Sequence, residues 1–419
     1  MKIKDELIVK IIRYNNEAEG VAIYNGFVIF VKGALKDEEV KIKIEKVYKN
    51  YATAKIIKIL IKSDKRRIPV CPFYEKCGGC NIMHMEQTEQ LEFKRNKVES
   101  VLKKIGNYNF DIPNTFFYNN LNYRNKAIFK VENDKIGYYM YKSNSLVDVN
   151  ECLICDKKIN ESLAIIREFI KENKNHNISE VMIRVAKDEV LIRLDNLNSI
   201  YEDDIKLLLK NTNSLYIGDK LINGIPSINQ KLNDLVFDIS PNSFFQINPE
   251  TASKLYEYAL KDVNDKNICI DLYSGTGTIT MLLAKRARRV IGIEVVEDAV
   301  NDAENSLLLN NINNVEFKLG KVEDLIDEIK DFNIDTLVLD PPRGGSDRKT
   351  LNSILKIRPK DIIYISCNPI TLVRDINIIK KDYEIKSIRV FDMFPNTTHV
   401  ETVMVLEKKD IWVISFFMV

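Results

Sequence analysis

Three cysteines in the segment CPFYEKCGGC, at positions 71, 77 and 80, are the first residues whose type and spacing indicate chemistry. The whole chain has only seven cysteines in 419 residues. The N-terminus MKIKDELIVKII is a poor signal peptide, because Lys10 interrupts its apolar run and no small-residue cleavage site follows. Without export a disulfide is disfavoured, and thiolates clustered in this way suit an iron–sulfur cluster or zinc.

A second group of reactive residues follows predicted strands in the C-terminal half. Cys367 comes just after the apolar run IIYIS and before a predicted helix, whose dipole favours a thiolate. His399 and Glu401 begin the last predicted strand, which runs the opposite way and therefore opens at the same edge of the sheet. A single Glu or His on a strand is normally a surface residue, so the inference depends on this convergence.

Two loops in the same half suit a nucleotide-type ligand. Gly275 and Gly277 in DLYSGTGT allow a tight turn and a close approach of the backbone to a ligand. A dinucleotide fingerprint needs a third glycine where Thr280 stands, and Asp271 before the loop favours a cationic ligand over a pyrophosphate. Glu294 ends the next strand at the usual spacing of roughly 20 residues and suits ribose hydroxyls.

The elements that must position these residues form a regular pattern from about residue 250. Strand-like runs alternate with helical periods, which predicts a doubly wound, mostly parallel α/β sheet with its ligand site at the carboxyl ends of the strands. The run LVLDPPRGG ends in two prolines that fix the directions of Asp340 and Arg343. The last two runs, KSIRVFDM and VETVMVLE, are expected to form an antiparallel hairpin at one edge.

The N-terminal part has another pattern. Residues 7–60 alternate apolar with polar side chains over short strands, as in a small OB-like barrel. Between positions 41 and 67 ten lysines or arginines face only two acids, a block that attracts phosphate backbones, although a solvated lysine face is the alternative. The whole chain carries a net charge of only +2. No apolar run approaches the roughly 18 residues of a membrane span, so a cytoplasmic protein without a membrane partner is expected.

Seven motifs in order, CPFYEKCGGC, YRNKA, SFFQINPE, DLYSGTGT, LDPPR, SCNP and HVET, give the chain a family resemblance. It resembles the S-adenosylmethionine-dependent RNA uracil-5-methyltransferases, especially the iron–sulfur branch that modifies bacterial 23S ribosomal RNA. The resemblance implies an N-terminal TRAM barrel (1–62), a central α+β domain around a 4Fe–4S cluster (63–240) and a class I methyltransferase domain (241–408). The apolar tail 409–419 has no assigned role.

The resemblance also assigns residues. It implies that Cys367 is the nucleophile and Glu401 the base, and that the cofactor site is lined by Gln246, Tyr273, Glu294 and Asp340. For the cluster it implies three close ligands and one remote ligand: Cys71, Cys77, Cys80 and Cys152. Cys155 is the alternative fourth ligand, and zinc the alternative metal, although zinc usually prefers two close pairs of ligands.

The implied function is methylation of carbon 5 of a uridine in RNA, with S-adenosylmethionine as methyl donor and a covalent Cys–uracil C6 intermediate. The expected substrate is 23S ribosomal RNA, with transfer RNA as the alternative, and the enzyme is expected to be a monomer. Two other classes remain open at this stage. A dinucleotide-dependent oxidoreductase with an iron–sulfur centre is disfavoured by the missing glycine, and a non-catalytic RNA-binding protein by the intact Cys367 and Glu401.

Overall fold

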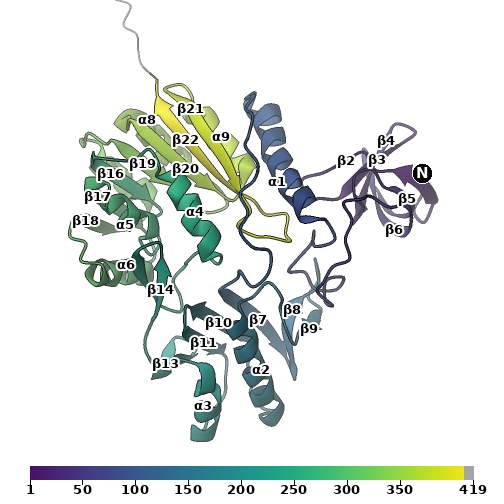
Figure 1. Cartoon of the computed structure of the whole chain (residues 1–419), viewed down its shortest axis with the longest axis horizontal. Helices are drawn as coiled ribbons and strands as arrows, with labels where there is room; N and C mark the ends of the chain where they lie inside the picture. Colours follow the sequence, from purple (N-terminus) through teal and green to yellow (C-terminus); the bar gives the residue numbers. More distant parts are fainter. Residues whose placement is uncertain (410–419) are drawn as a thin grey trace, which may run out of the picture.

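The computed structural model describes residues 1–409, and the apolar segment 410–419 lies outside the described residues. Three sheets of six or seven strands and one two-stranded hairpin organise this part of the chain. In Figure 1 the N-terminal strands form one lobe, a second sheet lies below, and a sheet covered by helices lies at the upper left. None of the helices within residues 1–409 combines the length and apolarity needed to cross a membrane.

The N-terminal sheet, here called the barrel, has the strand order β1-β5-β6-β4-β3-β2. Its strands are β1 (Glu6–Lys10), β2 (Arg13–Tyr14), β3 (Gly20–Tyr24), β4 (Phe27–Lys32), β5 (Glu39–Val47) and β6 (Tyr51–Ile61). Alternation decides which face is inside: Val40, Ile42 and Ile44 of β5 are buried in its core, while the lysines between them point away. The strand pattern predicted for residues 7–60 is therefore present.

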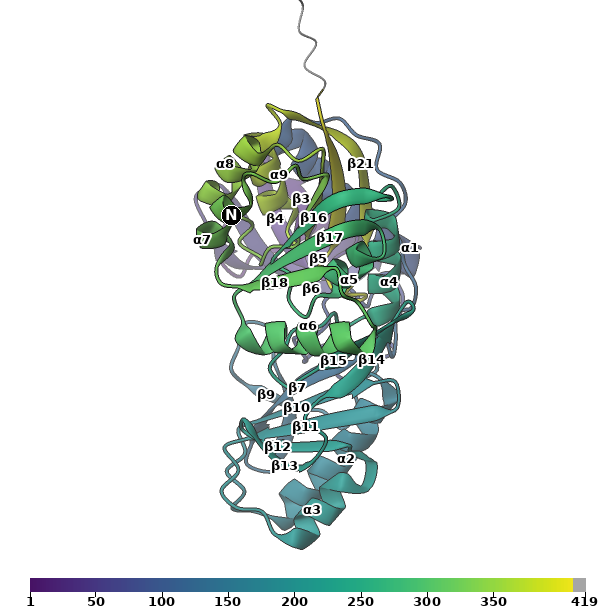
Figure 2. The same ribbon diagram turned by 90° about the vertical axis from the view of Figure 1, so that its left-hand side faces the viewer.

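The central sheet has the order β13-β12-β11-β10-β7-β8-β9. Its strands are β7 (Lys126–Glu132), β8 (Lys135–Tyr139), β9 (Leu146–Asp148), β10 (Glu180–Ala186), β11 (Glu189–Asp195), β12 (Ser214–Ile217) and β13 (Lys220–Gly224). One face is covered by α2 (Lys157–Glu172) and α3 (Glu202–Leu208), which lie at the bottom of Figure 2. Leu163, Ile166 and Phe169 of α2 fall at helical spacing and pack against that face.

The C-terminal sheet has the order β18-β17-β16-β19-β20-β22-β21. Its strands are β16 (Lys266–Leu272), β17 (Ala287–Glu294), β18 (Val315–Leu319), β19 (Thr336–Leu339), β20 (Asp361–Ser366), β21 (Tyr383–Phe391) and β22 (Glu401–Lys408). Its helices are α4 (Pro249–Ala259), α5 (Thr278–Ala284), α6 (Glu297–Leu309), α7 (Val322–Leu325), α8 (Arg348–Ile357) and α9 (Pro369–Ile379). The hairpin β14 (Ile228–Leu232) and β15 (Leu235–Ile239) leads into this region.

The strands of the C-terminal sheet bury both faces. In β20, Ile362 and Tyr364 enter one core with α8 and α9, while Ile363 and Ile365 enter another with α4 and α5. Neighbouring strands repeat this alternation, so the apolar runs seen in the sequence are those of a doubly covered parallel sheet. The predicted edge hairpin is present: β22 runs antiparallel to both β20 and β21.

Helix α1 (Gln87–Val101) connects the parts of the molecule. It lies between the barrel and the C-terminal sheet in Figure 1, and its Val98 and Val101 enter the same core as α9. This helix belongs in sequence to the predicted central region 63–240, but it packs on the C-terminal sheet. The segment that follows the cysteine cluster is thereby fastened next to the edge where β21 turns into β22.

Candidate active site

A cavity of about 780 Å³, here called the C-terminal cavity, lies at the carboxyl ends of the parallel strands β16, β17, β19 and β20. Its volume falls within the roughly 300–1,000 Å³ of small-molecule sites. The structure brings together in it every residue that the sequence assigned to catalysis or cofactor binding: Gln246, Tyr273, Glu294, Asp340, Cys367 and Glu401. For five of them the convergence follows from the sheet, because they lie at the ends of neighbouring strands, whereas Gln246 comes from the segment before α4.

The glycine loop between β16 and α5 shapes one wall. Gly275 has a φ of +54° with open space where a Cβ would stand, so its backbone is accessible to a ligand. Gly277 has a φ of +72°, and a Cβ there would stand 2.7 Å from Phe317. Glu294 fixes this loop by accepting hydrogen bonds from the backbone N–H of Gly275 (2.8 Å) and of Val296 (2.9 Å).

Asp271 differs from its expected position. Its carboxylate was expected to face a cationic ligand, but it is fully buried, does not line the C-terminal cavity, and accepts a hydrogen bond from the Thr280 hydroxyl at 2.6 Å. Burial raises the pKa of Asp271 to about 7. Thr280, which the sequence marked only as a missing glycine, therefore ties α5 to β16.

Strand pairing brings Cys367 and Glu401 to the same place. Ser366 of β20 pairs with Thr402 of β22, and Cys367 and Glu401 are the next residues toward the cavity. Asn368 follows as the N-cap of α9, its side chain accepting from the backbone N–H of Ile370 at 3.1 Å. The predicted positions, one after a parallel strand and one at the start of an antiparallel strand, are thus adjacent.

Burial governs the protonation of these groups. It raises the pKa of Asp340 to about 7, and burial together with the nearby Asp340 holds the pKa of Glu401 well above its usual value. Burial, followed by the charge of Glu401, raises the pKa of Cys367 to about 11, while Arg343 opposes this shift. Burial and the carboxylate thus oppose the thiolate that the helix N-terminus was expected to favour in the free protein.

Arg343 and His399 form a polar contact at the cavity. The Nη2 atom of Arg343 lies 2.9 Å from Nδ1 of His399, and the Arg343 carbonyl accepts from the Asn368 side chain at 3.2 Å. Burial, and then the charge of Arg343, lowers the pKa of His399 to about 4, so the imidazole is neutral and accepts from the guanidinium. His399 thus holds Arg343 at the mouth of the cavity instead of competing with Glu401 for a proton.

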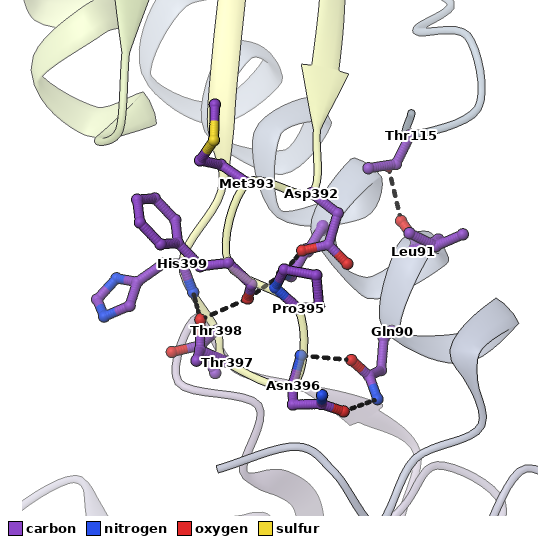
Figure 3. A network of polar contacts seen from close by, with 12 residues as sticks. Gln90, Leu91, Thr115, Asp392, Met393, Pro395, Asn396, Thr397, Thr398 and His399 are labelled. Atoms are coloured by element: carbon purple, nitrogen blue, oxygen red, sulfur yellow. Dashed lines mark hydrogen bonds and ion pairs between the residues drawn. The ribbon is translucent and has the colours of Figure 1, made fainter. Parts of the chain in front are cut away.

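The turn from β21 to β22, residues 392–400, is held from far away in the sequence. Figure 3 shows the Gln90 side chain accepting from the Asn396 backbone N–H (3.0 Å) and donating to the Asn396 side chain (3.3 Å). Lys94 of α1 pairs with Asp392, and both side chains are 0% exposed. Because this turn leads directly into Glu401, α1 determines where the predicted base stands.

The segment before α4 supplies residues that the sequence did not single out. Buried Arg184 donates to the carbonyls of Ser240 (3.0 Å) and Ser243 (2.5 Å), which fixes the chain as it enters SFFQ. Phe244 lines the C-terminal cavity and is largely exposed, so its ring is accessible to a ligand. Three further residues, Tyr256, Lys321 and Phe394, also line it. An aromatic pair directly before Gln246 was the available signal for Phe244.

The predicted cluster ligands meet at a separate site between the barrel and the central sheet. A small pocket of about 60 Å³ is lined by four cysteines, Cys71, Cys77, Cys80 and Cys152. Gly78 lets this loop close, because a Cβ there would stand 2.8 Å from the Tyr139 carbonyl oxygen. Cys155 does not line the pocket: it is buried, with its sulfur 3.8 Å from the Tyr138 hydroxyl.

The four sulfurs of the cysteine pocket do not form a preformed metal site. Within residues 1–409 no set of three or more His, Cys, Asp or Glu side chains is arranged to hold a metal ion. All four cysteines are free thiols in one apolar pocket, and three of them pack on Met83 and Ile154. The donor set fits a thiolate-ligated group in its chemistry, and the assignment of Cys152 as the fourth ligand stays a prediction.

Comparison with known proteins gives two family matches. The profile of the tRNA (Uracil-5-)-methyltransferase family matches residues 86–409, and that of the TRAM domain matches residues 4–57. An uncharacterized RNA methyltransferase of Clostridium acetobutylicum is 35% identical over 95% of this chain and 96% of its own. One of Listeria innocua is also 35% identical, over 94% and 96%.

A solved structure agrees over the same length. The tRNA (uracil-54, C5)-methyltransferase of Pyrococcus abyssi, in complex with S-adenosyl-L-homocysteine, superposes with a TM-score of 0.79 and is 27% identical. The similarity covers 95% of this chain and 99% of that one, so it includes the barrel as well as both larger sheets. With one family profile over three quarters of its length and full-length relatives that are RNA methyltransferases, the chain belongs to the tRNA (uracil-5-)-methyltransferase family.

Proposed function

We propose that this RNA methyltransferase transfers a methyl group from S-adenosylmethionine to carbon 5 of a uridine through a covalent adduct with Cys367. The observation that carries the proposal is the meeting of Cys367 and Glu401 in one cavity with the glycine loop. A nucleophile, a carboxylate and a wall suited to a nucleoside are the three parts that this reaction needs.

The residues act in a fixed order. The Cys367 sulfur, once deprotonated, adds to carbon 6 of uracil, which makes carbon 5 nucleophilic. S-adenosylmethionine, when bound, supplies the methyl group from its sulfonium. Glu401 then removes the carbon-5 proton, the C6–S bond breaks, and Cys367 leaves as a thiolate. Arg343 opposes the rise in the pKa of Cys367 in the free protein, and its charge supports the first step.

The cofactor is proposed to lie against the glycine loop. Glu294 ends β17 and Asp340 follows β19, so the two carboxylates lie on either side of the end of β16, the strand between them. They suit the ribose hydroxyls and the positively charged half of the cofactor. Gln246 and Tyr273 complete the proposed binding set. The homologous structure from Pyrococcus abyssi contains the demethylated product of the same cofactor, which supports this part of the proposal.

The cysteine pocket is proposed to hold a 4Fe–4S cluster. The four sulfurs belong to a loop after the barrel and to the segment before α2, so a ligated cluster would tie these segments together. Thiolate-only ligation suits such a cluster. No redox step is assigned to it, because methyl transfer to carbon 5 needs no electron.

For the RNA we propose 23S ribosomal RNA, supported by the cysteine motif that resembles the ribosomal branch. The barrel does not discriminate between ribosomal and transfer RNA as substrate, because the similarity to the Pyrococcus abyssi transfer-RNA enzyme extends over 95% of this chain. That similarity makes transfer RNA the second candidate.

One experiment separates these functions. Purified protein is incubated with labelled S-adenosylmethionine and with transcripts of 23S ribosomal RNA or of transfer RNAs. Label in 5-methyluridine of ribosomal transcripts alone is expected, whereas label in transfer RNA alone would select the second candidate. Transcripts with 5-fluorouridine should trap a covalent complex, because fluorine cannot leave as a cation. Absence of label and of adduct on both RNAs would contradict the proposed function.

A further inference from the structure

A second large cavity, of about 620 Å³, lies beside the C-terminal cavity and plays no part in the reaction above. The segment 244–250 separates the two: Phe244 and Gln246 line the C-terminal cavity, whereas Asn248 and Glu250 line the second one. A second connection is Tyr123, which lines the second cavity and donates from its hydroxyl to the Pro395 carbonyl (3.1 Å), next to Phe394 of the first. The two cavities therefore share the segment 244–250 as a common wall.

Amide side chains dominate the second cavity, here called the amide cavity. Six of them line it: Asn119, Asn122, Asn125, Gln230, Asn233 and Asn248. Asn248 is buried, and its side chain already forms hydrogen bonds within the protein: it donates to the Met393 carbonyl (3.2 Å) and accepts from the Thr251 N–H (3.2 Å). The exposed Asn122 has no side-chain hydrogen bond to another described residue, so both its donor and its acceptor are available. Amides that offer both are the groups that read the edges of nucleobases.

An exposed aromatic ring lines this cavity. Tyr118 is 56% exposed, and within the described part of the chain its ring stacks on no other aromatic ring. A ring in this position provides a flat apolar surface beside hydrogen-bonding groups. Proteins that bind unpaired RNA combine these two elements, because an unstacked base needs both a stacking partner and contacts to its edge.

The charge of the lining decides between a base and a phosphate. Two carboxylates, Asp156 and Glu250, oppose two ammonium groups, Lys187 and Lys231, so the lining has no net charge. A phosphate site needs an excess of cations. A neutral, flat ligand with donors and acceptors on its edge, such as a nucleobase, fits this lining better.

We propose that the amide cavity receives an unstacked base of the RNA close in sequence to the target uridine, with Tyr118 as its stacking surface. This inference rests on the proposed function, because it takes RNA as the substrate. The shared segment supports it: a uridine turned into the C-terminal cavity leaves its neighbours unpaired, and the amide cavity lies across segment 244–250 from that site. The cavity is thus a specificity site that holds the target in register.

The test uses the full-length protein and whichever transcript, from transfer RNA or 23S ribosomal RNA, the wild type methylates. Tyr118→Ala is expected to bind this transcript roughly 5- to 100-fold more weakly, as for the loss of one base stack. Tyr118→Phe keeps the ring and should bind as the wild type does. Tyr201→Ala, at a 70% exposed tyrosine outside both cavities, is the matched control and should also bind normally. Affinity for S-adenosylmethionine should be unchanged in all three.

A scan of the RNA makes the test independent of the protein variants. Abasic nucleotides are placed one at a time around the methylated uridine, and wild-type affinity is expected to fall at one position in particular. At that position Tyr118→Ala should lose nothing further. Normal binding by a folded Tyr118→Ala variant, or a flat abasic scan with the wild type, would overturn the inference while methylation itself persists. A wild type that methylates neither RNA would instead contradict the proposed function.

Discussion

Asp340 and Glu401 both line the C-terminal cavity, although one follows β19 and the other begins β22. Burial, and then the charge of Asp340, keeps the pKa of Glu401 raised, and burial raises the pKa of Asp340 to about 7. The same carboxylates raise the pKa of Cys367, whose first cause is also burial. The Cys367 thiol is therefore protonated at neutral pH in the free protein, and the pKa of Glu401 is shifted in the same direction.

The rate of methyl transfer is therefore expected to rise with pH toward the Cys367 pKa of about 11, because deprotonation of Cys367 and of Glu401 both favour the reaction. Asp340→Asn removes the negative neighbour, lowers both pKa values and should shift the profile to lower pH. Single-turnover rates at saturating cofactor measure this. Glu323→Gln, a carboxylate of the same cavity that does not act on Glu401, should leave the profile in place. An alkaline shift for Asp340→Asn would show that the coupling is misassigned.

Cys367→Ala and Glu401→Gln are expected to fail in different ways. The first variant should bind RNA and S-adenosylmethionine but form no adduct, because the nucleophile is missing. The second should still add to carbon 6 and accept the methyl group, then stall with a methylated protein–RNA adduct, because nothing removes the carbon-5 proton. Denaturing electrophoresis with labelled cofactor detects this adduct. Methylation by Cys367→Ala, or normal turnover by Glu401→Gln, is the outcome that the assigned roles do not allow.

Glu294→Ala is expected to weaken binding of S-adenosylmethionine roughly 10- to 100-fold, the usual effect of losing a charge-assisted hydrogen-bond partner. Part of this loss of affinity is expected from a change in the glycine loop, because Glu294 also accepts a hydrogen bond from the Gly275 N–H at 2.8 Å. Calorimetry gives the affinity. Glu297→Ala, three residues later and outside the cavity, serves as the control. Equal affinities of the two variants would place the ribose elsewhere.

Lys94→Met is expected to destabilise the protein by about 3–5 kcal/mol, because it leaves the Asp392 carboxylate buried without a partner. Lys254→Ala breaks an exposed pair with Glu257 and should cost less than about 1 kcal/mol. Chemical denaturation measures both free energies of unfolding. Similar values for the two variants would mean that water or another group compensates Asp392.

Anaerobically purified protein is expected to be brown and to contain about four irons per chain. Cys152→Ser should lose iron, and Cys155→Ser should retain most of it, because only Cys152 lines the cysteine pocket. Metal analysis and visible absorption measure the difference. Stoichiometric zinc in a colourless protein, or the reverse behaviour of the two variants, would contradict the assignment.

The sequence alone predicted the architecture of the C-terminal sheet and the meeting of its loops. The signals are local: alternating runs, a glycine loop and two prolines mark strand ends, and parallel strands present these ends at one edge. For this reason Glu294, Asp340, Cys367 and Glu401 could be expected at one edge of the sheet, whereas Gln246 and Tyr273 were implied by the family resemblance. The barrel followed in the same way from its short alternating strands.

The tertiary structure decided what depends on residues far apart in the chain. Burial and the neighbouring Glu401 raised the pKa of Cys367. Lys94 and Gln90 fixed the turn 392–400, which lies about three hundred positions away in the sequence. Tertiary packing also placed Cys152, but not Cys155, at the cysteine pocket. It likewise formed the amide cavity next to segment 244–250. A pattern of neighbours along the chain carries no information on desolvation or on cavities, because both are made by surfaces that meet only after folding.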